Sequence, residues 1–192
     1  MGLSLVVAPT VEPVSLAEAK AHLKVTESED DGLIAGYILA ARRAAESYIR
    51  GAMITQTWDY TLDYSWPIVS VRGMCKNRIE LPLQPVQSVT YVHYVDDDGA
   101  TQTLSSALYT LHKFGNGSYI EKAYDASFPS IRSVPDAITV RFVAGYLPES
   151  VPDEIRTAIM LGIEAIYDRC EDGDVCNAKN ALLDPYRMLR VA

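Results

Sequence analysis

The histidines and cysteines are the residues of this chain best suited to bind a metal ion or to act as nucleophiles. The chain has 3 of each, and the histidines are His22, His93 and His112. None of them lies at the HExxH, CxxC or zinc-finger spacing that places several ligands around one ion. We therefore interpret the histidines as surface or rim residues, and we expect neither a metal site nor a bound cofactor.

The cysteines also lack the spacing of a reactive pair. Cys170 and Cys176 have five residues between them, whereas redox motifs place two residues between their cysteines. Cys170 falls on the apolar stripe of a predicted helix, where a free cysteine packs as a small apolar residue. With Cys75, the set is sparse and odd in number, which indicates free thiols and not a disulfide framework.

Carboxylates and hydroxyls are likewise without a supporting catalytic or binding motif. The run Asp96–Asp98 before Gly99 lacks the alternating ligands and the final Glu of a calcium loop, so it reads as a solvated turn. The sequence contains no glycine-rich phosphate loop and no GxSxG elbow. Asp59, Asp63 and Glu80 could pair in space, but a solvated sheet face is favoured. A hydrolase has the least support, and we expect no enzyme and no catalytic residue.

Composition excludes two further classes of protein. The net charge of −8 argues against a protein that grips nucleic acid through a basic face. No apolar run approaches the ~20 residues of a membrane span, and residues 1–13 lack the basic start of a signal peptide.

Tyrosine is unusually frequent, with 12 Tyr against 3 Phe. Tyrosine is enriched at interfaces and on exposed sheet faces, and both interpretations stay open.

A short helix is predicted over residues 13–25, near the start of the chain. Ser15 and Glu18 have the S-x-x-E spacing of a capping box, which satisfies free N–H groups at a helix start. A helix of two to three turns is marginal alone and must pack on other elements. We expect its apolar stripe, formed by Leu16, Ala19 and Leu23, to be buried. The remaining polar side chains, Lys20, His22 and Lys24, are expected to face solvent or a neighbouring subunit.

Longer elements follow with a change of period. Apolar residues at three- and four-residue steps predict long helices over 29–50 and 148–170. Between them, alternating apolar residues and two Gly-containing turns predict antiparallel strands and hairpins. Residues 171–180 read as a polar loop, and Pro185 prevents a long helix in the last residues.

Together these elements predict an α+β fold. It is a small helical bundle, made of a short amino-terminal helix and two long helices, with an inserted antiparallel β-rich domain and an extended carboxy-terminal tail. The expected parts are an amino-terminal helical part (1–53), the β-rich domain (54–147), a helical part that completes the bundle (148–182) and the tail (183–192).

The ordered set of segments resembles the head–tail connector (adaptor) proteins of long-tailed bacteriophages and gene transfer agents, in the variant with an inserted β domain. Each motif is weak alone, but the match runs in order through nearly the whole chain. The resemblance implies a virion structural protein of the neck, made in the bacterial host cytoplasm. The segments that carry it are PVSLAEAKAHLKV, AARRAAESYIRGAMITQTWDY, IELPLQPVQSVTYVHYVDDDGA, ITVRFVAGY, VPDEIRTAIMLGIEAIYDR and LLDPYR.

The resemblance also implies partners. It implies a homo-oligomeric ring, a dodecamer, beneath the portal protein and above a tail-side stopper or tail terminator protein. The ring continues the DNA channel, DNA passes without sequence-specific binding, and no membrane is involved. The carboxy-terminal segment is implied to dock on the portal, a role that we carry onto Leu183, Pro185, Tyr186, Arg187, Met188, Leu189 and Arg190.

A ring would multiply the acidic surplus around its axis. Acids that face the channel would repel DNA and let it slide, the opposite of binding through released counterions. The alternative function is a monomeric carbohydrate- or protein-binding module that uses the Tyr-rich β domain. The candidate channel acids are Glu29, Asp30, Asp31, Glu171, Asp172 and Asp174.

Overall fold

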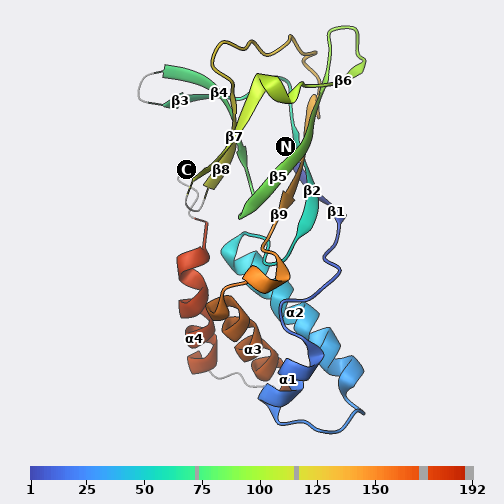
Figure 1. Cartoon of the computed structure of the whole chain (residues 1–192), viewed down its shortest axis with the longest axis vertical. Coiled ribbons are helices and arrows are strands. Elements are labelled where there is room, and N and C mark those ends of the chain that lie inside the picture. The colour runs from blue at the N-terminus through green and yellow to red at the C-terminus, as the bar shows by residue number, and fades with distance from the viewer. Residues whose placement is uncertain (72–73, 115–116, 169–172, 189–192) are drawn as a thin grey trace. The chain divides into compact units, whose positions relative to one another are not determined.

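The chain forms two compact units in a computed structural model, and each unit combines segments that are distant in the sequence (Figure 1). The β unit consists of Met1–Ala8 and Gln56–Gly145, and the helical unit consists of Pro9–Thr55 and the chain from Tyr146 onward. The structure describes residues 1–71, 74–114, 117–168 and 173–188; within them, the side chains of 68–71, 74–77, 114, 173 and 174 are left undescribed.

The helical unit contains four α-helices, as far as the structure describes the chain. The capping box is confirmed: the Glu18 N–H donates to Ser15 Oγ at 3.2 Å, and the Ser15 N–H donates to Glu18 Oε2 at 2.8 Å. Short 3-10 turns precede α3 and follow α4, at Pro148–Ser150 and Asp184–Tyr186. The helices are α1 (Leu16–Leu23), α2 (Asp31–Ile49), α3 (Asp153–Tyr167) and α4 (Gly173–Leu183).

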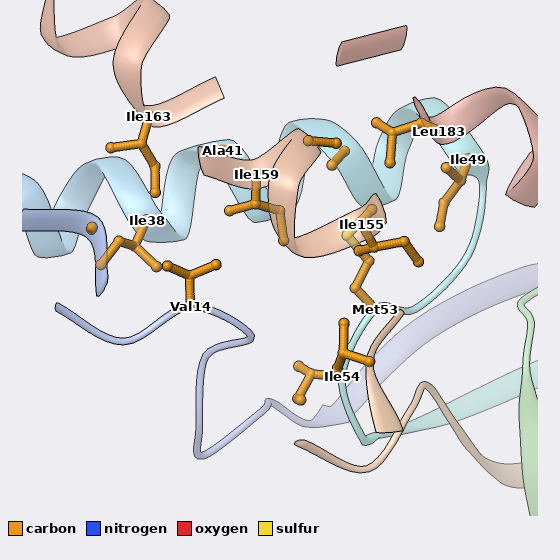
Figure 2. Close-up of a cluster of buried hydrophobic side chains, with 14 of the residues drawn as sticks. Val14, Ile38, Ala41, Ile49, Met53, Ile54, Ile155, Ile159, Ile163 and Leu183 are labelled. Atoms are coloured by element: carbon orange, nitrogen blue, oxygen red, sulfur yellow. The ribbon is translucent and has the colours of Figure 1, made fainter. Parts of the chain in front are cut away.

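The core of the helical unit lies between α2 and α3. Figure 2 shows Ile38 of α2 with Ile155 and Ile159 of α3 among the clustered side chains, all of them buried. The two helices approach closely because small residues face each other: a Cβ on Gly162 would lie 3.3 Å from the Ala41 Cβ. Ala19 of α1 is buried in this core, and Leu16 and Leu23 pack against it half-buried, so the short helix packs on the long ones.

Helix α4 corrects two expectations. Most of residues 171–180, predicted as a polar loop, are helical, and Leu183, predicted as the start of an extended tail, is fully buried in the helical core. The pattern was misleading because residues 171–180 are mostly polar, and packing stabilises a helix more than propensity does. Cys176 lies exposed on this helix, whereas Cys170 falls outside the described residues.

The β unit is built from two antiparallel sheets, as expected for an inserted β-rich domain. The alternation seen in the sequence is confirmed in β9 (Ile138–Ala144), where Ile138, Val140 and Phe142 are fully buried. The five-stranded sheet has the order β1 (Gly2–Val7), β2 (Gln56–Leu62), β9, β5 (Val86–Val95), β6 (Thr101–Thr103). The four-stranded sheet has the order β3 (Ile68–Val71), β4 (Met74–Leu81), β8 (Gly117–Lys122), β7 (Tyr109–Phe114).

Strand β1 is a further correction. Residues 1–53 were assigned to the helical part, but Gly2–Val7 pairs antiparallel with β2 and belongs to the β unit. A short apolar run such as GLSLVV has no period that separates a strand from a buried helix segment, and its partner strand lies about fifty residues further along the chain. Local sequence therefore could not assign this segment.

Candidate functional site

The residues expected to dock on a partner at the carboxy terminus are folded back on the helical unit. Their first residue, Leu183, is fully buried, and the Met188 N–H donates to the Ile49 carbonyl oxygen at the end of α2, at 2.9 Å. Residues 183–188, which we call the carboxy-terminal segment, are thus anchored at both ends. The prediction of an extended tail over these residues is therefore wrong.

Tyrosine–carboxylate hydrogen bonds hold the carboxy-terminal segment between its two anchors. The Tyr48 hydroxyl donates to Asp184 Oδ1 at 2.6 Å, and this bond raises the pKa of Tyr48 because it holds the phenolic proton. The Tyr186 hydroxyl donates to Glu154 Oε2 at 3.1 Å, and the pKa of Tyr186 is raised first by burial and then by that bond.

Part of the segment remains accessible to a partner. Pro185 and Arg187 are exposed, and the Arg187 guanidinium lies 5.3 Å from the centre of the Tyr48 ring. Leu189 and Arg190 fall outside the described residues. A partner could therefore contact the outer side of this segment, while Leu183 supports it from the core.

The candidate channel acids differ in their exposure and in the hydrogen bonds and ion pairs that they form. Glu29 is exposed, whereas Asp30 accepts the Tyr167 hydroxyl at 3.4 Å and Asp31 pairs with Lys20 at 2.5 Å. Asp30 and Asp31 lie at the start of α2, where the helix dipole favours negative charge. Glu171, Asp172 and the side chain of Asp174 lie outside the described part.

The polar side chains of α1 are less free than their sequence position suggested. Lys20, expected to face solvent or a neighbour, is bound to Asp31 of α2. His22 Nε2 lies 3.0 Å from Glu164 Oε2 of α3. The third of these residues, Lys24, has an exposed side chain, and it ends the helix in the left-handed conformation at φ 58°.

A buried ion cluster on α2 was not predicted from the sequence. Arg42 is 4% exposed, and its guanidinium donates to Glu12 Oε2 and to Glu46 Oε2, each at 2.6 Å. Glu46 Oε1 also accepts the Met53 N–H at 3.0 Å. The cluster therefore links two stretches of chain, one around Glu12 and one around Met53, to helix α2. The i, i+4 spacing of Arg42 and Glu46 was the available signal.

A small open pocket of about 280 Å³ lies beside Glu12. Its size is slightly below that of typical small-molecule sites, and its one charged lining residue, Glu12, already binds Arg42. It suggests no particular ligand. The remaining lining residues are Val11, Val14, Ser15, Leu16, Ala35 and Ile38.

The histidines of the sheets are engaged in stacking. His93 stacks on Tyr91 with ring centres 3.8 Å apart, and the Arg141 guanidinium lies over the same tyrosine at 4.9 Å. His112 stacks on Tyr119 at 5.0 Å. Among the described side chains there is no group of three or more His, Cys, Asp or Glu placed to hold a metal ion. No helix in the described residues has both the length and the apolar character to cross a membrane.

The side chains of β1 are all exposed, whereas the carboxy-terminal segment is anchored by the buried Leu183. All six residues of β1 are exposed, including Leu3, Leu5 and Val7. The strand lies at the end of its sheet, and in the described chain no other strand pairs with its outer side. We call this surface the amino-terminal edge; the sequence analysis did not predict it.

Comparisons with known proteins agree with this architecture. Residues 13–94 match the family model of phage gp6-like head-tail connector proteins. A chain in the virion of a native gene transfer agent (GTA) particle is similar over 100% of this chain and 98% of its own length, with a TM-score of 0.78 and 23% identity. No curated protein matches the chain by sequence.

Two neck structures show the same fold. Chains in the neck of an empty GTA particle, solved with C6 symmetry, and in the neck of a native GTA particle, solved with C12 symmetry, each have a TM-score of 0.79 and 24% identity. Each match covers 100% of this chain and 98% of the other. The resemblance to head–tail connectors and the α+β fold expected from the sequence are confirmed.

Proposed function

We propose that this chain is a structural protein of a virion or virion-like particle, with a head–tail connector role in the neck and no enzymatic activity. The family match over residues 13–94 supports the connector role. The observation that carries the proposal is the full-length match, because chains from GTA necks share the helical unit and the β unit together. A shared helical unit alone would have been a much weaker argument, since small bundles serve many functions.

In this proposal the chain forms a ring beneath the portal protein. Twelve copies would match the C12 symmetry of the related neck. The ring continues the DNA channel toward a tail-side stopper or tail terminator protein, and DNA passes without sequence-specific contacts. The protein is made in the cytoplasm of the bacterial host and ends in the particle neck.

The carboxy-terminal segment supplies the portal-docking surface in this proposal. Arg187 and Pro185 are exposed on a segment whose core anchor is Leu183, so a partner would meet a positioned surface. An arginine held beside a tyrosine ring can bind a carboxylate through two parallel hydrogen bonds.

The acidic surplus has a separate role in the proposal. With a net charge of −8 per copy, a ring of copies has a strongly negative potential, and acids near the lumen repel DNA phosphates. Glu29 is the candidate best placed to act in this way, because its side chain is exposed, whereas Asp30 and Asp31 are engaged by Tyr167 and Lys20. A ring map with a basic or neutral lumen would contradict this part of the proposal.

Portal binding can be tested by pull-down with the portal protein of the same particle. Deleting residues 183–192 is unsuitable because it removes the buried Leu183. The double variant R187A/R190A keeps Leu183 and removes the two arginines proposed to bind the portal, and we expect about tenfold weaker binding or more. The matched control is R132A, an exposed arginine of the β unit, which should bind as the wild type does. Equal binding by both variants would refute the docking role.

A further inference from the structure

We propose that the amino-terminal edge is a contact between neighbouring copies of this chain, in which a segment of one copy adds a strand to β1 of the next. The proposal rests on the proposed function, since a ring places copies side by side.

The geometry of β1 leaves one side of its backbone open. The strand pairs with β2 from Gly2 opposite Thr61 to Val7 opposite Thr57, with a register shift between Leu5 and Val7, and the sheet order ends there among the described strands. The outer side of an edge strand presents a row of N–H and C=O groups that can pair with another chain. Addition of a strand to such an edge is a recurrent mode of peptide recognition.

The side chains of β1 extend the apolar inner face of the sheet beyond its covered part. Register places Leu3 beside Tyr60 and Leu5 beside Trp58, on the same face as the fully buried Val140 and Phe142. Yet Leu3 is 39% exposed and Leu5 is 46% exposed. An added strand would cover both leucines and remove their apolar surface from water.

The opposite end of the same sheet shows how an edge is normally protected. Strand β6 has three residues, Thr101–Thr103, all polar and exposed. Short and polar edges discourage pairing with other chains, as do lysine and proline. Residues 2–7 contain neither lysine nor proline and run for six residues, so the amino-terminal edge lacks every one of these protections.

Charge favours a second copy as the occupant. Each copy carries a net charge of −8, so two copies repel wherever their acids face each other. Residues 1–11 contain no Asp, Glu, Lys or Arg, and the terminal ammonium is paired with Asp63 at 2.5 Å. This uncharged edge is a surface where two identical acidic chains can approach without that repulsion, whereas a basic partner would be drawn to the acids instead.

The size and symmetry of the contact indicate which arrangement it serves. A contact through one strand of six residues buries far less surface than the ~1,600 Å² interface of a stable complex. The edge must therefore act together with other contacts around a ring. Pairing of β1 with β1 of another copy would be self-complementary and would stop at two copies. The added segment therefore comes from a different part of the neighbour.

The test compares L5K with T101K, its counterpart on β6, in the full-length chain on portal rings. Native mass spectrometry counts bound copies, and circular dichroism confirms folding. A lysine at Leu5 places an unpaired charge in the contact, and we expect the concentration for half-assembly to rise about tenfold or more, while T101K assembles as wild type. In wild-type rings, hydrogen exchange of residues 3–7 should be slower than in the free chain, with β6 unchanged.

The outcomes separate this inference from the proposed function. Rings that form equally well with L5K, or that show no slower exchange in residues 3–7, overturn the edge contact and leave the connector role standing. A wild-type chain that never assembles, alone or on portal, overturns both. If L5K fails to fold, the exchange measurement on the wild type decides. Slower exchange caused by a tail-side protein, and absent from rings without it, would also overturn a second copy as the occupant.

Discussion

The two ends of the chain are built in opposite ways. The carboxy-terminal segment is closed: Leu183 is fully buried, and Tyr48 and Tyr186 bind carboxylates that position it. The amino-terminal edge is open, since all six residues of β1 are exposed and its outer side pairs with no described strand. The sequence had suggested a free carboxy-terminal tail and had not suggested a strand at the amino terminus.

The difference shows that a terminal segment can be tied down either by a buried apolar side chain or by backbone pairing. Chain ends are poorly ordered unless they are tied down. Leu183 ties the carboxy-terminal segment to a core, so its exposed side chains are presented in fixed positions. β1 is tied by its backbone pairing with β2, which leaves its apolar side chains for a partner. In the two proposals both ends serve assembly, one through a supported polar surface and the other through an apolar edge.

The largest expected effect is loss of the buried anchor. Leu183→Ala should lower the free energy of unfolding by about 3 kcal/mol, because it removes buried methyl groups and leaves a cavity. Urea denaturation followed by circular dichroism measures this change. The matched control is Leu33→Ala on α2, where the leucine is 51% exposed and the change should be close to zero. Equal losses would mean that the carboxy-terminal segment is not anchored.

A smaller effect is expected from the hydrogen bond that holds the middle of the segment. Tyr186→Phe removes the donor to Glu154 and should cost about 0.5 kcal/mol, since the bond is partly exposed to water. Tyr124→Phe, at a tyrosine that is 92% exposed, is the control and should change nothing. Thermal unfolding of the three proteins side by side checks this, and a control as unstable as the variant would contradict it.

At the open end, substitution should leave the stability of the isolated chain almost unchanged. Leu5→Lys should shift the free energy of unfolding by no more than about 0.5 kcal/mol, because the lysine remains in water. The measurement is the same urea titration on the unassembled chain. A loss comparable to that of Leu183→Ala would show that β1 is part of the core and not a free edge.

The smallest effect is a pH dependence that differs between the two ends. The backbone N–H of Asp136 and the terminal ammonium lower the pKa of Asp63, so its stabilising effect is present above the usual value near 4 and is lost as pH falls through the lowered pKa. The pKa of Tyr48 is raised, so its effect is present below about 10 and is lost at higher pH.

Acid should therefore loosen the amino-terminal edge first, and alkali the carboxy-terminal segment. Methyl NMR signals of Leu3 and Leu5 should move in acid, and those of Leu183 should move in alkali. Asp63→Asn should abolish the acid change at the edge while leaving the alkaline change intact. Simultaneous changes at both ends in acid would indicate general unfolding and would contradict the assignment.

Much of the fold could be predicted because local patterns and tertiary packing agree. The capping box at Ser15, the stripe of α2 and the alternation of β9 each carry a period that burial then follows. Strand β1 and helix α4 could not be predicted because neither has such a period. Their structure depends on partners far away in the chain: β2 for the strand, and the α2–α3 core for Leu183.

The candidate site was predictable only in part. Arg187 and Pro185 are exposed as a docking role requires, but nothing in the ten residues of the predicted tail, 183–192, indicates that Leu183 is buried. The burial of Arg42 could not be predicted because charged side chains are rarely buried, and its partners Glu12 and Glu46 make burial possible. Pairings of this kind depend on the fold and not on local sequence.

The most direct test of the connector role is native mass spectrometry of the full-length chain mixed with the portal ring of its own particle. The account predicts a single complex with twelve copies of this chain per portal ring, in keeping with the C12 symmetry of the related neck. A chain that stays monomeric beside the portal at every concentration tested would contradict the account and would favour a monomeric binding module.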